Sequence, residues 1–209
     1  MDEKRAQTAE MQHGPLFDDP YEWFGEWFEY AMDNAAEAHA CVVSTVSEEG
    51  QPSSRVVYLK EWDARGFVWY TNLTSQKGRE ALATRRGAMN FFWRELREQI
   101  RIEGVIEQVS DEQANVYFAS RARGSQLGAW ASDQSSALES REALLSNLEE
   151  VSARFEGEDV PRPPHWSGLR LIPLHIEFWR AGEHRLHDRF LFSRPSPDTS
   201  SWKVERLNP

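Results

Sequence analysis

A short stretch near the C-terminus, Glu-His-Arg-Leu-His-Asp-Arg-Phe at residues 183–190, concentrates side chains suited to anion binding and proton chemistry. In an extended strand, alternation would place Arg185, His187 and Arg189 on one face. Two guanidinium groups beside an imidazole repel one another unless an anion lies between them, and arginine donors suit phosphate or carboxylate. Histidine readily changes charge near neutral pH. The pattern indicates an anion site or, alternatively, a solvated edge strand.

A second basic stretch, Arg-Val-Val-Tyr-Leu-Lys, occupies residues 55–60. Alternation divides it between two faces, with Arg55, Val57 and Leu59 on one and Val56, Tyr58 and Lys60 on the other. Cationic residues at both ends of an apolar strand can hold a ligand that is flat in the middle and charged at its end. An ordinary strand with two basic ends is the alternative.

Two further groups point to phosphate. Between Tyr70 and Gly78 a predicted strand ends, hydroxyl residues follow, and a helix begins with Lys77 in its first turn. Helix N-termini present unpaired N–H groups that suit phosphate, although a simple capped helix has the same pattern. Tyr117 and Arg121 are neighbours on a predicted helix, and Ser125 follows a short bend. This group could bind a second phosphate, or could be only a helix end with a favourable arginine.

Several familiar catalytic motifs are missing from the sequence. It has no glycine-rich dinucleotide or Walker loop, no Gly-x-Ser-x-Gly motif, and no His/Cys cluster with metal-ligand spacing, so we expect no metal site. Basic clusters without a metal, an activated nucleophile or paired carboxylates indicate that a bound organic cofactor carries the chemistry.

Composition narrows the class of protein. The chain has 209 residues, 40% of them hydrophobic and 28% charged, which is typical of a soluble globular protein. Its formal net charge of -10 argues against general nucleic-acid binding. One cysteine, Cys41, excludes an intrachain disulfide and is expected in the core. No run approaches the roughly 18 apolar residues of a membrane span, and residues 1–13 lack a signal-peptide core, so we expect a cytoplasmic protein.

The pattern of elements favours a mainly β fold with flanking helices. We expect residues 1–18 to be a flexible segment, followed by one domain over residues 19–209. Asp18-Asp19-Pro20 predicts the start of a helix with an apolar face, and Ser110 with Gln113 forms a capping box. Strands are predicted at 40–46, 53–60, 67–71, 88–93, 99–109, 169–179, 189–193 and 202–207, and further helices at 74–84, 110–120, 125–130 and 138–155. Short turns between the strands favour an antiparallel sheet or barrel.

The motifs together resemble the pyridoxamine/pyridoxine 5′-phosphate oxidase family. Those that carry the resemblance are Arg-Val-Val-Tyr-Leu-Lys, Tyr-Thr-Asn-Leu with Ser-Gln-Lys, Gly-Ser-Gln-Leu-Gly-Ala-Trp-Ala-Ser-Asp-Gln-Ser-Ser, and Glu-Phe-Trp with Arg-Leu-His-Asp-Arg-Phe. The resemblance covers about residues 19–209. It implies an antiparallel split β-barrel homodimer with FMN at each subunit interface. It also implies oxidation of pyridoxamine or pyridoxine 5′-phosphate to pyridoxal 5′-phosphate by dioxygen, with hydrogen peroxide as product.

The resemblance also assigns site residues. It implies an FMN site of Arg55, Val56, Val57, Tyr58, Leu59, Lys60, Tyr70, Thr71, Gln76, Lys77, Gln99, Gln134, Ser135, Trp179 and Arg189. For the substrate it implies Lys60, Tyr117, Arg121 and Ser125 around the phosphate, and Arg185, Leu186 and His187 at the pyridine ring, with Arg185 and His187 as catalytic residues. Two ligands that each carry a phosphate need two separate cationic sites, and the basic clusters supply two.

The sequence departs from the family pattern in two places. Gln76 stands where the family usually carries arginine, which removes one cation from the FMN phosphate site. An N-terminal Arg-x-x-Tyr segment, which often covers the substrate, is missing from residues 1–20. Gln76 and the residues after it are also similar to phenazine-pathway oxidases of the same superfamily, which tend to lose the substrate-phosphate residues that this chain keeps. A flavin- or pyridoxal-phosphate-binding protein without turnover is a further alternative.

Overall fold

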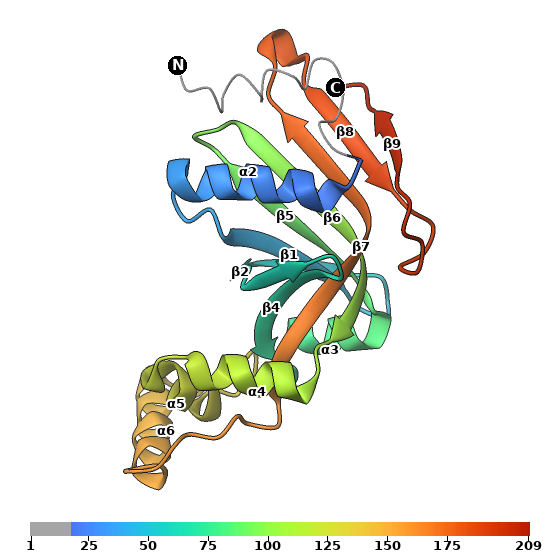
Figure 1. The fold of residues 1–209 in the computed structure, drawn as a ribbon. Helices are drawn as coiled ribbons and strands as arrows, with labels where there is room; N and C mark the ends of the chain where they lie inside the picture. Colours follow the sequence, from blue (N-terminus) through green and yellow to red (C-terminus); the bar gives the residue numbers. More distant parts are fainter. Residues whose placement is uncertain (1–17) are drawn as a thin grey trace.

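The computed structural model describes residues 18–209, which form a curled antiparallel sheet with helices around it (Figure 1). In these residues the sheet has nine strands in the order β2-β1-β5-β6-β7-β4-β3, with β8 beside β7 and β9 beside β8. The strands are β1 (Ala40–Val46), β2 (Pro52–Tyr58), β3 (Glu61–Asp63), β4 (Gly66–Asn72), β5 (Arg86–Trp93), β6 (Glu98–Gln108), β7 (Trp166–Arg180), β8 (Asp188–Ser193) and β9 (Lys203–Arg206). The helices are α2 (Pro20–Asn34), α3 (Gln76–Thr84), α4 (Asp111–Ser120), α5 (Arg123–Ala131) and α6 (Arg141–Arg154), with a 3-10 turn, η2, at Glu183–Arg185.

Curvature of the sheet begins where β6 pairs with β7. The register between these two strands shifts at Glu103 and Gly104, which is a β-bulge. A Cβ at Gly104 would lie 2.0 Å from the carbonyl oxygen of Ile172, so the close approach of the two backbones requires glycine. The long strands bend around this point into a curled half-barrel, which agrees with the antiparallel split β-barrel that the resemblance implies (Figure 1).

Helix α2 covers the concave side of the upper sheet. Asp19 caps it by accepting a hydrogen bond from the Tyr21 N–H at 2.9 Å, and Pro20 occupies its first turn. Trp23 and Phe24 on its buried face are fully shielded, and the Trp23 ring stacks on Phe178 of β7 with ring centroids 4.3 Å apart. This aromatic core holds the sheet in one shape and accounts for much of the Trp and Phe content.

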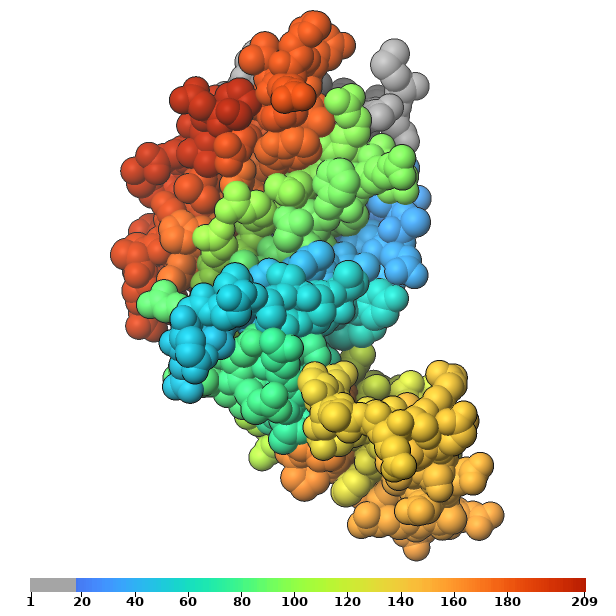
Figure 2. All heavy atoms as spheres, turned by 180° about the vertical axis from the view of Figure 1, so that it is seen from behind, coloured from blue at the N-terminus to red at the C-terminus, as the bar shows by residue number. Residues whose placement is uncertain are grey.

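Helices α4, α5 and α6 lie at one end of the molecule and form a smaller apolar cluster around Phe118, Phe155 and Trp166. They follow β6 and return to the sheet through β7. Both Figure 1 and Figure 2 show them at the end opposite the turn that joins β7 to β8. The arrangement brings α4 and α5 against the ends of β4 and β7.

Most predicted elements are confirmed with small shifts at their ends. Helix α6 begins at Arg141 because the Ser140 side chain caps it, and β7 starts at Trp166 inside the predicted connector. The short strand β3 was not predicted. The segment predicted to be flexible, residues 1–18, lies outside the described residues except for Asp18, so its flexibility stays a prediction.

The extended conformation considered for residues 183–190 does not occur in the first half of this stretch, which lies between the strands predicted at 169–179 and 189–193. Glu183–Arg185 form a 3-10 turn, His184 and Arg185 have φ values of 53° and 64°, and β8 begins only at Asp188. Because β7 and β8 are antiparallel neighbours, the chain must reverse between Arg180 and Asp188. Consequently, strand alternation does not place Arg185, His187 and Arg189 on one face.

Neither a membrane-spanning helix nor a metal-binding cluster occurs in the described part. No helix within residues 18–209 combines the length and apolar character needed to cross a bilayer. In the same residues, His, Cys, Asp and Glu side chains nowhere gather in a group that could hold a metal ion.

Candidate cofactor and substrate site

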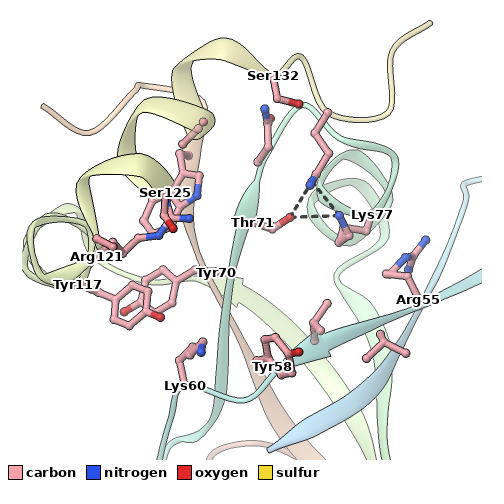
Figure 3. Close-up of a pocket in the computed structure, with 18 residues that line it drawn as sticks. Arg55, Tyr58, Lys60, Tyr70, Thr71, Lys77, Tyr117, Arg121, Ser125 and Ser132 are labelled. Carbon is pink, nitrogen blue, oxygen red and sulfur yellow. Dashed lines mark hydrogen bonds between the residues drawn. The ribbon is translucent and has the colours of Figure 1, made fainter. Parts of the chain in front are cut away.

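A cavity of about 800 Å³ lies between strands β2 and β4 and helices α3, α4 and α5 (Figure 3). It brings together residues that are far apart in the sequence. The predicted site residues that line it are Arg55, Val56, Val57, Tyr58, Lys60, Tyr70, Thr71, Lys77, Tyr117, Arg121, Ser125 and Gln134. Asn72, Ala122, Gly128, Ala129, Ser132 and Trp166 complete the lining and were not predicted.

The first cationic group of the cavity lies at the start of α3. Ser75 caps this helix by accepting from the Gly78 N–H at 3.3 Å. The Lys77 ammonium donates to the side-chain oxygens of Thr71 at 3.3 Å and Gln134 at 2.8 Å. Burial, together with the nearby Arg55, lowers the pKa of Lys77 from its usual value. A lysine held this way, beside a helix N-terminus, is a site for an anionic group.

Arg55 reaches the same end of the cavity from β2. Its guanidinium donates to the Thr45 hydroxyl at 2.7 Å and to the Ser53 hydroxyl at 2.5 Å, and lies 3.8 Å from a carboxylate oxygen of Glu80. Burial lowers the pKa of Arg55, and the Glu80 charge partly offsets that effect. The side chain is therefore held firmly beside Lys77 (Figure 3).

The second cationic group lies on the α4–α5 side. Arg121 packs against Trp166, with its guanidinium carbon 4.8 Å from the ring centroid, and Nη1 of Arg121 is buried without a hydrogen-bond partner. Figure 3 shows Tyr117 and Ser125 next to Arg121, and Lys60 below them. A buried guanidinium N–H without an acceptor is costly, so the site is suited to an anion that supplies one.

A stack of three aromatic rings forms the wall behind this second group. Tyr70 and Tyr117 are almost parallel with centroids 3.8 Å apart, and the Trp166 ring lies parallel to both, 5.2 Å from Tyr70 and 6.2 Å from Tyr117. The Tyr70 hydroxyl donates to Glu61 at 2.6 Å, and the other oxygen of Glu61 accepts from the Gln113 amide at 2.7 Å. Burial, followed by this hydrogen bond to Glu61, raises the pKa of Tyr70.

Glu61 accepts hydrogen bonds from the Tyr70 and Gln113 side chains behind the cavity wall, and neither Glu61 nor Gln113 was predicted as a site residue. Gln113 was predicted as half of a capping box, and its backbone N–H does donate to Ser110 at 3.1 Å. Its side chain, however, turns to Glu61 instead of returning to the helix start. A carboxylate directly after Lys60 was the only available signal, and a single charge at a strand end predicts no partner.

The charge of the cavity is opposite to that of the whole chain. Among the described residues that line it, Arg55, Lys60, Lys77 and Arg121 are cationic, and none is Asp or Glu. The chain as a whole carries a formal charge of -10. An acid-free pocket with four cations in an acidic protein is suited to a ligand, or a pair of ligands, with several negative charges.

Three residues of the implied FMN site lie beside this cavity without lining it. Leu59 is buried in the main core, and Ser135 is exposed with a φ of 72°. Gln76 is turned away from the cavity, because its amide donates to Glu80 at 2.9 Å. The expectation that Gln76 contacts the FMN phosphate stays a prediction, although Gln76 does not line the cavity.

The remaining predicted residues form a second cluster on the sheet. Strand pairing aligns Gln99 of β6, Trp179 of β7 and Arg189 of β8 in one row. The His187 ring packs on Trp179 at a centroid distance of 4.7 Å, and its Nδ1 accepts from the Gly182 N–H at 3.2 Å. A neutral His187 therefore carries its proton on Nε2.

The β7–β8 turn carries the three residues that the resemblance implies at the pyridine ring, Arg185, Leu186 and His187. Arg185 and Leu186 are both exposed. Gly182 is needed here, because a Cβ would lie 1.7 Å from the carbonyl oxygen of Leu186. Arg189 donates to Glu177 at 2.7 Å, and this bond raises the pKa of Arg189. Within one chain the second cluster does not join the cavity, and the two regions lie toward opposite ends of the molecule (Figure 1).

Comparison with known proteins gives a consistent result along the chain. The family model described as "Pyridoxamine 5'-phosphate oxidase" matches residues 29–155, and the one described as "Pyridoxine 5'-phosphate oxidase C-terminal dimerisation region" matches residues 166–209. A Myxococcus xanthus protein named pyridoxine/pyridoxamine 5'-phosphate oxidase is 52% identical over 192 residues, 91% of this chain and 92% of that protein. A Burkholderia mallei protein of the same name is 48% identical over 202 residues, 96% of this chain and 94% of that protein.

Two solved structures have the same fold. PhzG from Burkholderia lata, in complex with tetrahydrophenazine-1-carboxylic acid, superposes with a TM-score of 0.87 at 33% identity, covering 96% of each chain. A pyridoxamine 5'-phosphate oxidase-related, FMN-binding protein from Nostoc punctiforme gives a TM-score of 0.72 at 17% identity, covering 90% of this chain and 97% of that one. The second likeness concerns the fold alone.

Proposed function

Since this chain belongs to the pyridoxamine 5′-phosphate oxidase family, we propose that it oxidises pyridoxamine or pyridoxine 5′-phosphate to pyridoxal 5′-phosphate, with FMN as cofactor and dioxygen as oxidant. The observation that carries the proposal is one acid-free cavity with two separate cationic groups. Cofactor and substrate each bring one phosphate, so each cationic group has an anion to bind.

The residues that line the cavity supply cations and hydrogen-bond donors for both phosphates. At one end, Lys77, Arg55 and the start of α3 supply two cations and helix N–H groups for the FMN phosphate. At the other, Arg121 has a buried N–H without an acceptor, which the substrate phosphate would satisfy. Tyr117, Ser125 and Lys60 lie beside it as further donors.

FMN held in this cavity would supply the redox chemistry, a two-electron oxidation of the substrate with dioxygen as final acceptor and hydrogen peroxide as product. The residues of this chain bind and orient. Anchoring each flat ligand by its phosphate fixes the distance between the two rings, which converts binding energy into orientation. The Tyr70–Tyr117–Trp166 stack limits how far the substrate phosphate site can move.

The second cluster supports a site shared between two copies of the chain. The sheet face that bears it is continuous, through the strand pairing, with the cavity wall at Val56 and Tyr58. That face exposes apolar side chains, namely Val56 (66% exposed), Phe92 (56%) and Val42 (37%). Exposed apolar residues gathered on one face mark an interaction surface. We propose that a second copy covers it, in line with the match of residues 166–209 to a dimerisation region.

In such a dimer, Gln99, Trp179 and Arg189 of one subunit would complete the FMN site of the other. Arg185 and His187 would then reach the substrate ring, Arg185 as a cation and His187 through the proton on Nε2. In a single chain Arg185 is exposed and His187 is half-buried against the Trp179 ring, so both side chains lie at the surface where a second copy could meet them.

A phenazine-pathway oxidase is the second candidate, because PhzG shares 33% identity and a TM-score of 0.87 with this chain. The ligand in that complex, tetrahydrophenazine-1-carboxylic acid, carries no phosphate. The grouping of Arg121, Tyr117 and Ser125 in one cavity favours a phosphorylated substrate here. A flavin-binding protein without turnover would have the same cavity and is separated by the experiment below.

Anaerobic reduction tests the proposal. The purified protein with bound FMN is mixed without oxygen with pyridoxine 5′-phosphate, pyridoxamine 5′-phosphate or unphosphorylated pyridoxine, and the flavin absorbance is followed. We expect bleaching with both phosphorylated compounds, recovery when air is admitted, and little change with pyridoxine. A protein that binds FMN but never bleaches would be a binder without turnover. Reduction by a phenazine precursor alone would establish the second candidate.

A further inference from the structure

Glu80 is a buried carboxylate directly behind the first cationic group and has no role in the function proposed above. It lies on α3, one helical turn after Gln76, is 9% exposed, and does not line the cavity. One of its oxygens, Oε2, accepts from the Thr45 hydroxyl at 2.5 Å and the Ser53 hydroxyl at 2.6 Å. The other, Oε1, accepts from the Gln76 amide at 2.9 Å.

The same two hydroxyls hold Arg55. Nη1 of Arg55 donates to the Thr45 oxygen at 2.7 Å, and Nη2 donates to the Ser53 oxygen at 2.5 Å. A hydroxyl has one hydrogen to donate and lone pairs to accept with. Because each hydroxyl donates to Glu80, its lone pairs are available to the guanidinium. Glu80 therefore determines the direction of both hydroxyls, and the hydroxyls determine the position of Arg55.

Glu80 also keeps its charge. Burial raises its pKa, but the hydrogen bonds from Ser53, Thr45 and Gln76, together with Arg55, outweigh that effect and leave the pKa below its usual value. An ionised carboxylate cannot donate a hydrogen bond, so the two hydroxyls have only one way to face it. Three elements, β1, β2 and α3, meet in this network.

We propose that Glu80 is a positioning residue of the FMN phosphate site, which acts on the phosphate through Arg55 by way of the Thr45 and Ser53 hydroxyls. Gln76 is part of the same hydrogen-bond network, because its amide orients the Glu80 carboxylate instead of contacting the phosphate. The inference rests on the FMN site of the proposed function and extends it to residues behind the cavity wall.

Flavin titrations test the inference, because riboflavin differs from FMN only by its phosphate. The dissociation constants of both ligands are measured by flavin fluorescence for the apo form of the full chain and its variants. In Glu80→Ala the hydroxyls lose their common acceptor, and we expect the FMN dissociation constant to rise about tenfold. The value for riboflavin should stay within about twofold, because riboflavin makes no use of Arg55.

The conservative variant provides the rescue. Both hydroxyls meet the same oxygen of Glu80, so the carbonyl oxygen of Glu80→Gln can accept both while Gln76 turns its amide over. We expect FMN binding within about threefold of the parent protein. Ser53→Ala removes one hydroxyl and should weaken FMN about threefold with riboflavin unchanged, which tests the idea even if Glu80→Ala does not fold. Glu49→Ala, an exposed site in the β1–β2 turn, removes the same charge and serves as the control.

The possible results distinguish a failure of the proposed function from a failure of the positioning role of Glu80. If the parent protein ignores FMN, the proposed function fails. If the parent binds FMN, then an unchanged or tighter FMN constant in Glu80→Ala and Ser53→Ala overturns the positioning role. An equal loss of FMN and riboflavin overturns it as well, because that would indicate damage to the whole cavity.

Discussion

At the scale of single residues, the unpaired N–H of Arg121 makes the sharpest prediction. Arg121→Ala removes a charged hydrogen bond to the substrate phosphate, and such bonds contribute about 1.5–3 kcal/mol. We expect the KM for pyridoxine 5′-phosphate to rise about 10- to 100-fold while FMN content stays unchanged. Steady-state kinetics and the flavin-to-protein ratio measure the two effects. Arg141→Ala, an exposed charge at the start of α6, is the matched control.

The lowered pKa of Lys77 predicts that FMN affinity depends on pH. Burial lowers the pKa of Lys77 in the free protein, and a phosphate dianion would raise it again by favouring the ammonium. FMN should therefore bind best below the lowered pKa and progressively less well as pH rises through it. Riboflavin titrations at each pH, from about pH 7 to about pH 10, correct for other groups. Lys77→Arg stays charged over this range and should abolish the dependence.

The stability of the apoprotein should change with pH in the opposite direction to FMN affinity, because it rises as pH increases through the lowered pKa of Lys77. Because folding lowers the pKa of Lys77, the folded chain binds fewer protons than the unfolded chain between the two pKa values. The destabilising contribution of the charged lysine is complete below the folded pKa and disappears as pH rises toward the unfolded value. Stability curves of the parent and Lys77→Met in the alkaline range should therefore converge. Curves that stay parallel would contradict a perturbed lysine.

At the scale of elements, Glu61 links β3 and β4 to α4. Its two oxygens accept from Tyr70 at 2.6 Å and Gln113 at 2.7 Å, so Glu61→Ala leaves both donors without their acceptor. We expect the free energy of unfolding to fall by about 1–3 kcal/mol, measured by chemical denaturation. Tyr70→Phe should cost less, and the double variant less than the sum, because both changes remove the same bond. Full additivity would indicate that the bond contributes nothing.

The sequence predicted most elements because their signals are local. Alternation identified β1 and the two faces of β2, and Ser75 and Ser110 marked helix starts that the structure confirms. The conformation of the β7–β8 turn, which lies between the strands predicted at 169–179 and 189–193, was not predicted, because His184 and Arg185 adopt positive φ without being glycine. Propensity does not predict that conformation in such residues.

The candidate site was predicted unevenly for a related reason. The resemblance assigned residues of β2 and α4 to the site, and strand and helix spacing agreed with it because spacing determines their neighbours. The orientation of Gln76 depends on Glu80, whose own environment comes from hydroxyls on β1 and β2. The orientation of a side chain in such a network is determined only when the three elements pack together. The spacing of residues in the sequence therefore does not predict it.

At the scale of the whole molecule, a shared site predicts that two impaired variants complement each other when the substrate is kept near the KM of the parent protein. Arg121→Ala weakens substrate binding in the cavity of its own chain, and Arg185→Ala would slow the reaction in the cavity of the other chain. Arg185→Ala alone should lose about 2–4 kcal/mol of transition-state stabilisation, with FMN content retained. In a closed two-fold dimer, a mixed pair contains one site with both residues intact.

Coexpression of the two variants with different tags tests this arrangement. Random pairing puts half of the chains in mixed dimers, so we expect about a quarter of the parental activity in the mixture. Purified mixed dimers should reach about half. Activity no greater than that of either variant alone would show that each chain uses its own Arg185, or that Arg185 takes no part.

The position of Val56 has a consequence for concentration. This residue belongs both to the cavity wall and to the exposed apolar face, so a ligand in the cavity touches the seam where a second copy would dock. Any ligand that binds the assembled state better than the separated chains must strengthen the assembly. Specific activity should therefore fall on extreme dilution, and saturating FMN should move that fall to lower protein concentration. Bound FMN would therefore stabilise the dimer, and the cellular concentration of flavin would determine the fraction of chains that is dimeric.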